Sequence, residues 1–118
     1  MPYTEDQLDD FYYSTDGYCR YCGKKISRIN YGSPEEIGAW VIDHVNPKNS
    51  RGSNEDHNLV PACYRCNSKK HKKTLLRWCR FLKNSEYSED IKLFEKIIKN
   101  CKKYRDDICY IIRQVRDE

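Results

Sequence analysis

The sequence predicts a small α+β domain that contains zinc, and three observations support this fold class. Two CxxC pairs are separated by forty residues. Two strand-like segments joined by a polar loop lie between these pairs. All five glycines and all four prolines precede Ala62, so the second half of the chain should be mostly helix. We therefore expect residues 1–74 to form a zinc-containing core with a short N-terminal helix, and residues 75–118 to form an all-helical C-terminal extension.

The composition indicates one small domain with a lean hydrophobic core. Of 118 residues, 38% are hydrophobic and 34% are charged, and small cores of this kind are often reinforced by a metal. No apolar run approaches the roughly 20 residues that a membrane span needs. The N-terminus does not have the basic-then-apolar order of a signal peptide. We therefore expect a cytoplasmic protein that makes no membrane contact.

The seven cysteines are better explained by zinc than by disulfides. An odd count without a signal peptide argues against a disulfide framework. Zinc takes four ligands in a tetrahedron, and each CxxC can supply two thiolates from one turn. Reduced core cysteines would not need two identical spacings, and a redox CxxC would not come as two matched pairs. The predicted zinc ligands are Cys19, Cys22, Cys63 and Cys66. Three others should be small buried hydrophobic side chains in helices: Cys79, Cys101 and Cys109.

The N-terminal part of the chain is predicted to contain a helix, a tight turn at the first CxxC pair and an insertion. Thr4 and Gln7 are the ends of a capping-box sequence, and apolar residues at helical spacing follow, which predicts a helix over residues 5–13. Gly23 follows the first CxxC and permits the positive φ that such a tight turn often requires. Residues 33–36 suit either the start of a short helix or a turn.

A hairpin is predicted between the two CxxC pairs. Residues 40–44 are rich in β-branched and aromatic side chains, which favour a strand. Residues 46–54 are rich in Asn, Ser, Gly and Pro and should form a loop. Residues 59–60 would be the returning strand, and Pro61 restricts that strand to a sheet edge or marks its end.

The helical half should contain several segments. One helix is expected to start near Tyr64 and run through the lysines, and residues 75–82 carry the apolar side of its continuation or of a second helix. Asn84 and Ser85 indicate a break. Ser88 could cap a further helix. The remaining apolar pattern fits one long helix or two helices with a break near Tyr104.

Four polar residues between and beside the CxxC pairs could hydrolyse a phosphodiester. This reaction needs an activated water and a cation that neutralises charge on the phosphate. Asp43 and His44 are adjacent on a strand, so their side chains should point to opposite faces unless the strand ends there, which suits a carboxylate on a metal and an imidazole on water. Asn67 should open the following helix, where its amide oxygen is a hard ligand that could complete the same metal site. Asn58 could bond the loop backbone and hold His44 in place.

These residues resemble the signature of the HNH endonuclease family, whose fold is the ββα-metal finger. The matching positions are Cys19-Arg-Tyr-Cys22-Gly23, Ile42-Asp43-His44, the Gly52-Ser53 loop, Asn58-Leu59 and Cys63-Tyr-Arg-Cys66-Asn67-Ser-Lys-Lys70. The resemblance covers residues of about 18–74. It implies that Asp43 binds the catalytic metal, that His44 is the general base, that Asn58 orients the loop and His44, and that the four cysteines hold structural zinc.

The chain departs from the usual pattern at Asn67, where the family commonly has His. It is similar in this to an HNN variant that includes a phage recombination endonuclease, so a bacterial or phage-type protein is expected. Loss of an imidazole ligand makes Mg²⁺ or Mn²⁺ the expected catalytic ion. His71 lies four residues on, on the same helix face, and could be an extra ligand, a phosphate contact or a plain surface residue.

The charge distribution favours a polyanionic partner. Residues 1–66 carry 7 basic and 10 acidic side chains, whereas residues 67–118 carry 15 basic and 8 acidic ones. A basic half suits DNA, although a solvated helix surface explains the charge equally well. The side chains expected to contact the phosphate backbone are Arg65, Lys69, Lys70, Lys72 and Lys73. The C-terminal helices could pack on the core, bind duplex DNA or form a homodimer. The alternative to a nuclease is a catalytically inert, zinc-stabilised module that binds nucleic acid.

Overall fold

A computed structural model describes residues 3–47, 52 and 54–118. Ser53 of the expected Gly52-Ser53 loop lies outside the described residues. The helices are α1 (Glu5–Ser14), α2 (Tyr64–Lys70), α3 (Leu75–Lys83), α4 (Ser88–Cys101) and α5 (Asp107–Arg116), and the strands are β1 (Trp40–His44) and β2 (Leu59–Cys63). Single 3-10 turns occur at Arg28–Asn30 and Asp56–Asn58.

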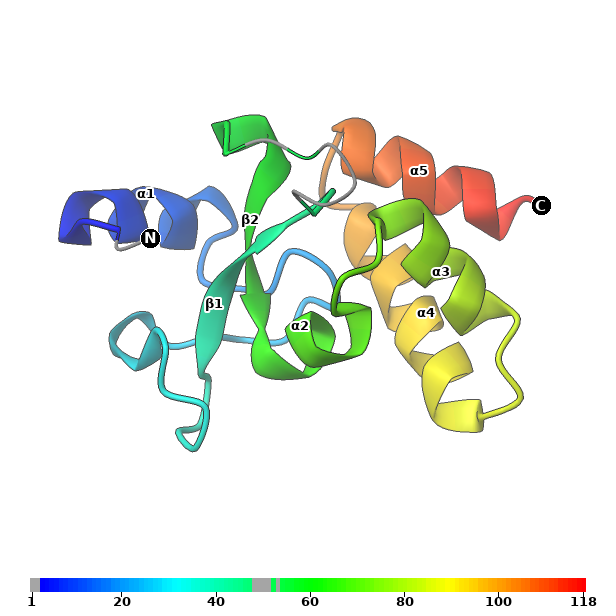
Figure 1. Ribbon diagram of the computed structural model, residues 1–118, viewed down its shortest axis with the longest axis horizontal. Coiled ribbons are helices and arrows are strands. Elements are labelled where there is room, and N and C mark those ends of the chain that lie inside the picture. Colours follow the sequence, from blue (N-terminus) through cyan, green and yellow to red (C-terminus); the bar gives the residue numbers. More distant parts are fainter. Residues whose placement is uncertain (1–2, 48–51, 53) are drawn as a thin grey trace.

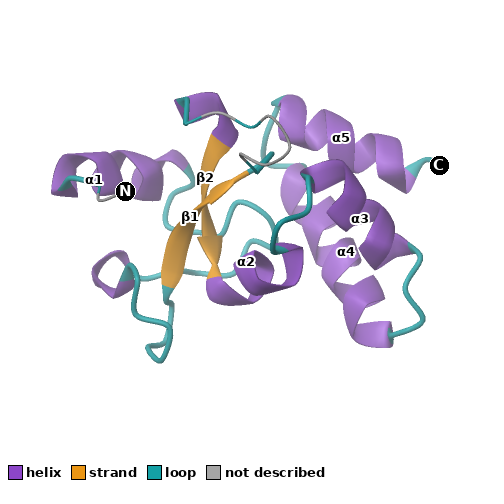
Figure 2. Ribbon diagram, viewed as in Figure 1, coloured by secondary structure: helices purple, strands orange, loops and turns teal. Residues whose placement is uncertain are grey.

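The hairpin β1–β2 lies at the centre of the molecule, as Figure 1 shows. Helix α1 lies on one side of it, and helices α3, α4 and α5 gather on the other, with α2 beside the foot of the hairpin (Figure 2). Helix α2 contacts both strands, and α3 contacts both α4 and α5. This arrangement confirms the small α+β fold with a short N-terminal helix and an all-helical C-terminal extension. No helix in the described ranges has the length and apolarity that crossing a membrane requires.

The capping box of α1 is confirmed. The Thr4 hydroxyl accepts a hydrogen bond from the Gln7 amide at 3.1 Å, and the Gln7 side chain accepts one from the Thr4 amide at 2.9 Å. Residues 33–36 form turns and not a helix. Arg28 ties this insertion to α1, because its guanidinium pairs with Glu5 and Asp9.

The hairpin is antiparallel, and it places Asp43 opposite Val60 and His44 opposite Leu59. Pro61 lies in the middle of β2 opposite Ile42. Proline is tolerated there because the sheet has two strands in the described chain, so each strand is an edge. The carbonyl of Pro61 instead accepts a hydrogen bond from the Arg20 amide at 2.9 Å, which docks the first CxxC turn against the outer side of β2.

The helix boundaries correct two expectations and resolve one. Helix α2 starts at Tyr64 as expected, so Asn67 lies one turn inside it and does not open it. Ser88 is the first residue of α4 and does not cap it; the preceding Ser85 receives the Tyr87 amide at 3.1 Å and contacts the Asp90 carboxylate. The break near Tyr104 is present, since α4 ends at Cys101 and α5 begins at Asp107.

The helical extension is fastened to the first CxxC turn. The buried Asn100 of α4 donates its side-chain amide to the carbonyls of Arg20 at 2.8 Å and Tyr21 at 3.2 Å. Gly23 has φ +79°, and a Cβ there would come within 2.7 Å of the Asn100 amide oxygen. Glycine is therefore required both by the turn and by the closeness of α4.

Hydrophobic packing continues across the expected boundary at residue 74. The rings of Tyr21 and Trp78 meet edge to face with centroids 5.3 Å apart, and neither side chain is exposed. Arg20, also buried, pairs with Asp106 at 2.7 Å. One hydrophobic cluster includes residues from both parts, so the core of the described residues is continuous across residue 74. The division into 1–74 and 75–118 therefore stays a prediction.

Replacing Asn100 by Ala should lower the free energy of unfolding by about 1–3 kcal/mol, because buried carbonyls of the CxxC turn would lose their donor. Chemical denaturation of the variant and the parent measures this difference. Asn84→Ala is the control: that amide is exposed and bonds a carbonyl within its own helix. Equal losses for the two variants would show that Asn100 does not fasten α4 to the turn.

Candidate active site

Four cysteine sulfurs converge between the first CxxC turn and the junction of β2 with α2. The ligand atoms of Cys19, Cys22, Cys63 and Cys66 all lie within 4.8 Å of one another. Zinc–sulfur bonds near 2.3 Å in a tetrahedron separate sulfur atoms by about 3.8 Å, and the Cys22 and Cys63 sulfurs are 3.8 Å apart. The donor set and its spacing therefore fit a metal ion such as zinc.

The four thiols strongly perturb one another. Hydrogen bonds from Cys19 and Cys22 lower the pKa of Cys63, whereas hydrogen bonding with Cys19 and Cys22 raises the pKa of Cys66. Thiols this close cannot all ionise unless a cation balances their charge. Three further cysteines are buried and unpaired in disulfide terms, as expected: Cys79, Cys101 and Cys109.

A separate pocket of about 420 Å³ brings together three of the four predicted catalytic residues. Asp43 and His44 reach it from the end of β1, and Asn67 reaches it from α2. His71 and Lys72, just beyond α2, also line it. The hairpin register and the position of α2 therefore produce the expected meeting of a carboxylate, an imidazole and an amide.

Asp43 is buried, and two neighbours hold one of its oxygens. The Tyr21 hydroxyl donates to Asp43 Oδ2 at 2.6 Å, and the Lys70 ammonium lies 3.1 Å from the same atom. Burial, reinforced by the Asp43 charge, raises the pKa of Tyr21, so the hydroxyl keeps its proton and donates it. In the described chain both of these contacts fall on Oδ2, and neither engages Oδ1.

Lys70 corrects one prediction, because it does not point toward solvent as a phosphate contact must. Its side chain is completely buried, and its ammonium donates to the carbonyl of His44 at 2.7 Å. Burial lowers the pKa of Lys70, while the carboxylate of Asp43 opposes that change. Lys70 is therefore an internal counter-ion that joins α2 to the last two residues of β1.

His44 is oriented by a residue that the sequence did not single out. Its Nε2 lies 2.9 Å from the side-chain oxygen of Asn54. An amide oxygen only accepts hydrogen bonds, so this contact places the proton on Nε2 and leaves Nδ1 as the basic nitrogen. Asn54 could not be found from sequence, since one Asn in an Asn-rich loop carries no distinguishing signal.

The Asn58 side chain bonds the backbone of the loop that follows His44. Its side chain accepts from the Asn46 amide and donates to the Asn46 carbonyl, both at 2.9 Å. The Asn58 carbonyl also accepts from the Val45 amide at 2.9 Å. These bonds pin the two ends of the loop that follows His44. The residue lies in a 3-10 turn just before β2 and not in the strand itself.

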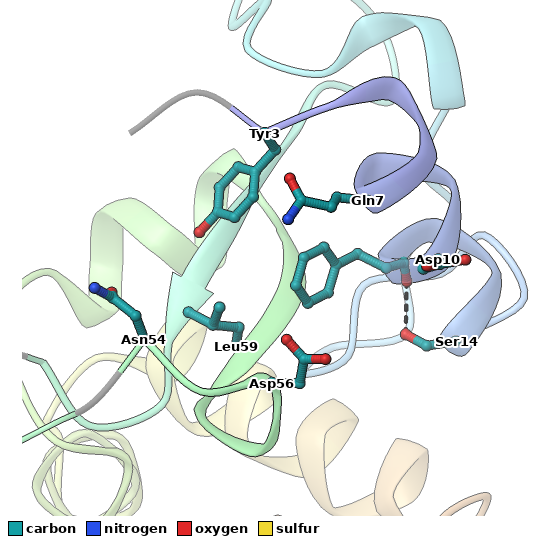
Figure 3. Close-up of a pocket in the computed structure, with 8 residues that line it drawn as sticks. Tyr3, Gln7, Asp10, Ser14, Asn54, Asp56 and Leu59 are labelled. Atoms are coloured by element: carbon teal, nitrogen blue, oxygen red, sulfur yellow. Dashed lines mark hydrogen bonds between the residues drawn. The ribbon is translucent and has the colours of Figure 1, made fainter.

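A second pocket, of about 300 Å³, lies between α1 and the segment leading into β2 (Figure 3). Tyr3, Gln7 and Asp10 line one side of it, and Asn54 and Asp56 line the other. Its carboxylates make it unsuited to a phosphate, so the pocket at His44 is the better candidate for phosphodiester chemistry despite its more open form.

The remaining basic residues of α2 and its continuation differ in availability. Arg65 is exposed, and Lys72 lines the His44 pocket. Lys73 lies 5.2 Å over the ring of Phe81, and Lys69 pairs with Asp90 at 3.2 Å. Contact of these four with nucleic acid stays a prediction.

Comparison with known proteins matches this region to one family. The family model described as HNH endonuclease matches residues 19–73, which contain both CxxC pairs and the whole hairpin. Over residues 19–73 the chain is therefore similar to the HNH endonuclease family.

Two similar proteins extend the comparison. YoqL, a candidate HNH endonuclease derived from the SPbeta prophage of Bacillus subtilis (strain 168), is 30% identical over 91 residues, or 75% of this chain and 38% of YoqL. The Type II-C Cas9 enzyme from Actinomyces naeslundii superposes with a TM-score of 0.57 at 19% identity, over 97% of this chain and 13% of that enzyme. The second likeness supports the fold, including its C-terminal helices. The chain spans little more than a third of YoqL.

Replacing Cys66 by Ser should abolish tight metal binding, because a closed site needs all four thiolates, and should unfold the hairpin since the metal contributes directly to folding. Elemental analysis of the purified protein is expected to find one zinc ion per chain in the parent. Cys79→Ala, at a buried cysteine outside the cluster, should retain that ion. Zinc retained by Cys66→Ser would contradict the assignment.

Proposed function

We propose that this chain is a metal-dependent endonuclease that hydrolyses phosphodiester bonds in DNA. The observation that carries the proposal is the meeting of Asp43, His44 and Asn67 in one pocket, with His44 already oriented by Asn54. The HNH match over residues 19–73 supports the same reaction class. Zinc is the proposed occupant of the four-cysteine cluster, where it stabilises the hairpin.

His44 is the proposed general base. With its Nε2 proton committed to Asn54, Nδ1 can accept a proton from a water molecule that attacks phosphorus. The Lys70 ammonium on the His44 carbonyl and the Asn58 bonds to the loop fix the backbone on both sides of this imidazole. Fixed geometry matters because a misplacement of about 1 Å can cost ~10²-fold in rate.

The oxygens of Asp43 and Asn67 are the proposed ligands of a divalent cation. One carboxylate and one amide suit Mg²⁺ or Mn²⁺, which keep several waters and complete their shell with substrate phosphate. When bound, such an ion supplies Lewis acidity at the phosphate and the leaving oxygen. His71 lines the same pocket and remains an additional candidate ligand or phosphate contact.

DNA is the proposed substrate on the grounds of charge and of family. Lys72 is inside the pocket, and Arg65, Lys69 and Lys73 extend the positive charge along the same segment. Such side chains neutralise phosphates without reading sequence. A homodimer through the C-terminal helices is a further proposal; these helices expose Phe81 and Tyr110.

The alternative is an inert, zinc-stabilised module that binds nucleic acid. Two observations favour it: Asn replaces His at position 67, and Lys70 already neutralises Asp43. A cleavage assay separates the two functions, because an inert module retards DNA in a gel without cutting it at any concentration of Mg²⁺ or Mn²⁺.

Replacing His44 by Ala should slow plasmid cleavage by ~10²–10⁴-fold, the usual contribution of a general base. Rates of nicking with Mg²⁺ or Mn²⁺ measure the effect. His57→Ala is the matched control, since His57 is exposed and lies outside the His44 pocket. If His44→Ala cuts as fast as the parent, the proposed mechanism is wrong.

Replacing Asn54 by Ala should lower the cleavage rate by up to ~10²-fold, because the imidazole loses the contact that fixes its orientation and tautomer. Asn54→Asp should restore much of the rate, since a carboxylate also accepts a hydrogen bond from His44 Nε2. Single-turnover rates at saturating DNA give the comparison. Equal rates for Asn54→Ala and Asn54→Asp would show that the hydrogen bond to His44 has no role.

A further inference from the structure

We propose that Tyr21, in the first CxxC turn, is a positioning residue for the divalent cation at Asp43. Its hydroxyl holds Asp43 Oδ2 and so keeps Oδ1 directed to the pocket. This inference rests on the proposed function, because it assumes that Asp43 is a metal ligand. It adds a residue outside the Asp43, His44, Asn58 and Asn67 set.

The geometry of Tyr21 is unusually well fixed for such a role. The side chain is 0% exposed, its hydroxyl lies 2.6 Å from Asp43 Oδ2, and its ring packs edge to face on Trp78. Its backbone is held as well, since the Tyr21 carbonyl accepts from Asn100 and the neighbouring Arg20 amide donates to Pro61. The hydroxyl is therefore aimed by its surroundings and not by chance rotation.

The competing interaction is the Lys70 ammonium. It lies 3.1 Å from Oδ2, and the Lys70 side chain is completely buried. A buried charge is costly unless it is paired, so the ammonium is strongly attracted to the carboxylate. An ammonium has three donors and could draw both carboxylate oxygens toward itself. Drawing both oxygens to the ammonium would require the carboxylate to rotate. Tyr21 opposes that rotation, because its short hydrogen bond from a fixed hydroxyl holds Oδ2 in place. Oδ1 then remains available as a ligand for a cation.

Tyr21 also connects the two metal sites of the proposed enzyme. It lies between Cys19 and Cys22 in the chain, so a metal ion held by those thiolates would also fix the position of the hydroxyl. Hydrogen-bond partners of metal ligands commonly matter to binding, and their loss typically costs about 10–100-fold in metal affinity. The four-cysteine cluster would thus set the geometry of the catalytic carboxylate through one side chain.

The test measures the affinity of Mn²⁺ for the zinc-loaded full chain without DNA. The electron paramagnetic resonance signal of free Mn²⁺ monitors the binding. Tyr21→Phe keeps the ring against Trp78 but removes the hydroxyl, and should weaken Mn²⁺ binding by about 10–100-fold. Tyr12→Phe is the matched control, because the Tyr12 hydroxyl bonds the Ile26 carbonyl and does not contact Asp43. Zinc content and thermal midpoint are measured for each variant.

A double-mutant cycle with Lys70→Met separates positioning from a structural effect. Removing the ammonium should tighten Mn²⁺ binding more in the Tyr21→Phe background than in the parent, because Tyr21 acts against Lys70. Strictly additive effects would overturn the inference, as would parental affinity in Tyr21→Phe. Asp43→Ala tests the proposed function separately: if it binds Mn²⁺ as the parent does, the metal assignment itself fails. Loss of binding in Asp43→Ala with none in Tyr21→Phe removes only the inference.

Discussion

The convergence of four sulfur atoms is the constraint on which the rest of the structure depends. It joins the turn at residues 19–22 to the junction of β2 and α2, two segments that are far apart in sequence. A two-stranded hairpin is marginal on its own, and this clamp holds its second strand from outside. The same turn receives Asn100 from α4 and Asp106 at the start of α5, so the helical extension is built on it as well.

The buried network at the end of β1 shows how the clamp reaches the candidate site. Tyr21 comes from the turn that carries the first CxxC pair, and Lys70 comes from α2, which contains Cys66. The two side chains meet at Asp43. A buried ammonium is costly unless it is paired and hydrogen-bonded. Lys70 meets both conditions, with Asp43 Oδ2 and the His44 carbonyl as partners. The position of β1 relative to α2 is thereby specified by electrostatics in addition to hydrophobic packing.

Sequence patterns revealed the parts of this arrangement that depend on local spacing. The capping box, the CxxC pairs, the hairpin and the loop-holding Asn58 each follow from residues near one another in the chain or from a family signature. Sequence places Lys70 among the phosphate contacts because lysines are rarely fully buried, whereas its partners in the structure come from β1, with His44 lying 26 residues away. Tyr21, Asn54 and Asn100 act only through tertiary contacts, and no periodicity or motif marks them.

The charge balance at Asp43 bears on how the proposed enzyme would use its cation. Among the described residues that line the His44 pocket, Asp43 carries the one anionic side chain, and Lys70 already offsets its charge. A divalent ion therefore gains less Coulomb energy from this site than from a pair of free carboxylates. A DNA phosphate would supply the missing negative charge and further oxygen ligands. Cation binding and substrate binding should then reinforce each other, because each reduces the electrostatic cost of the other.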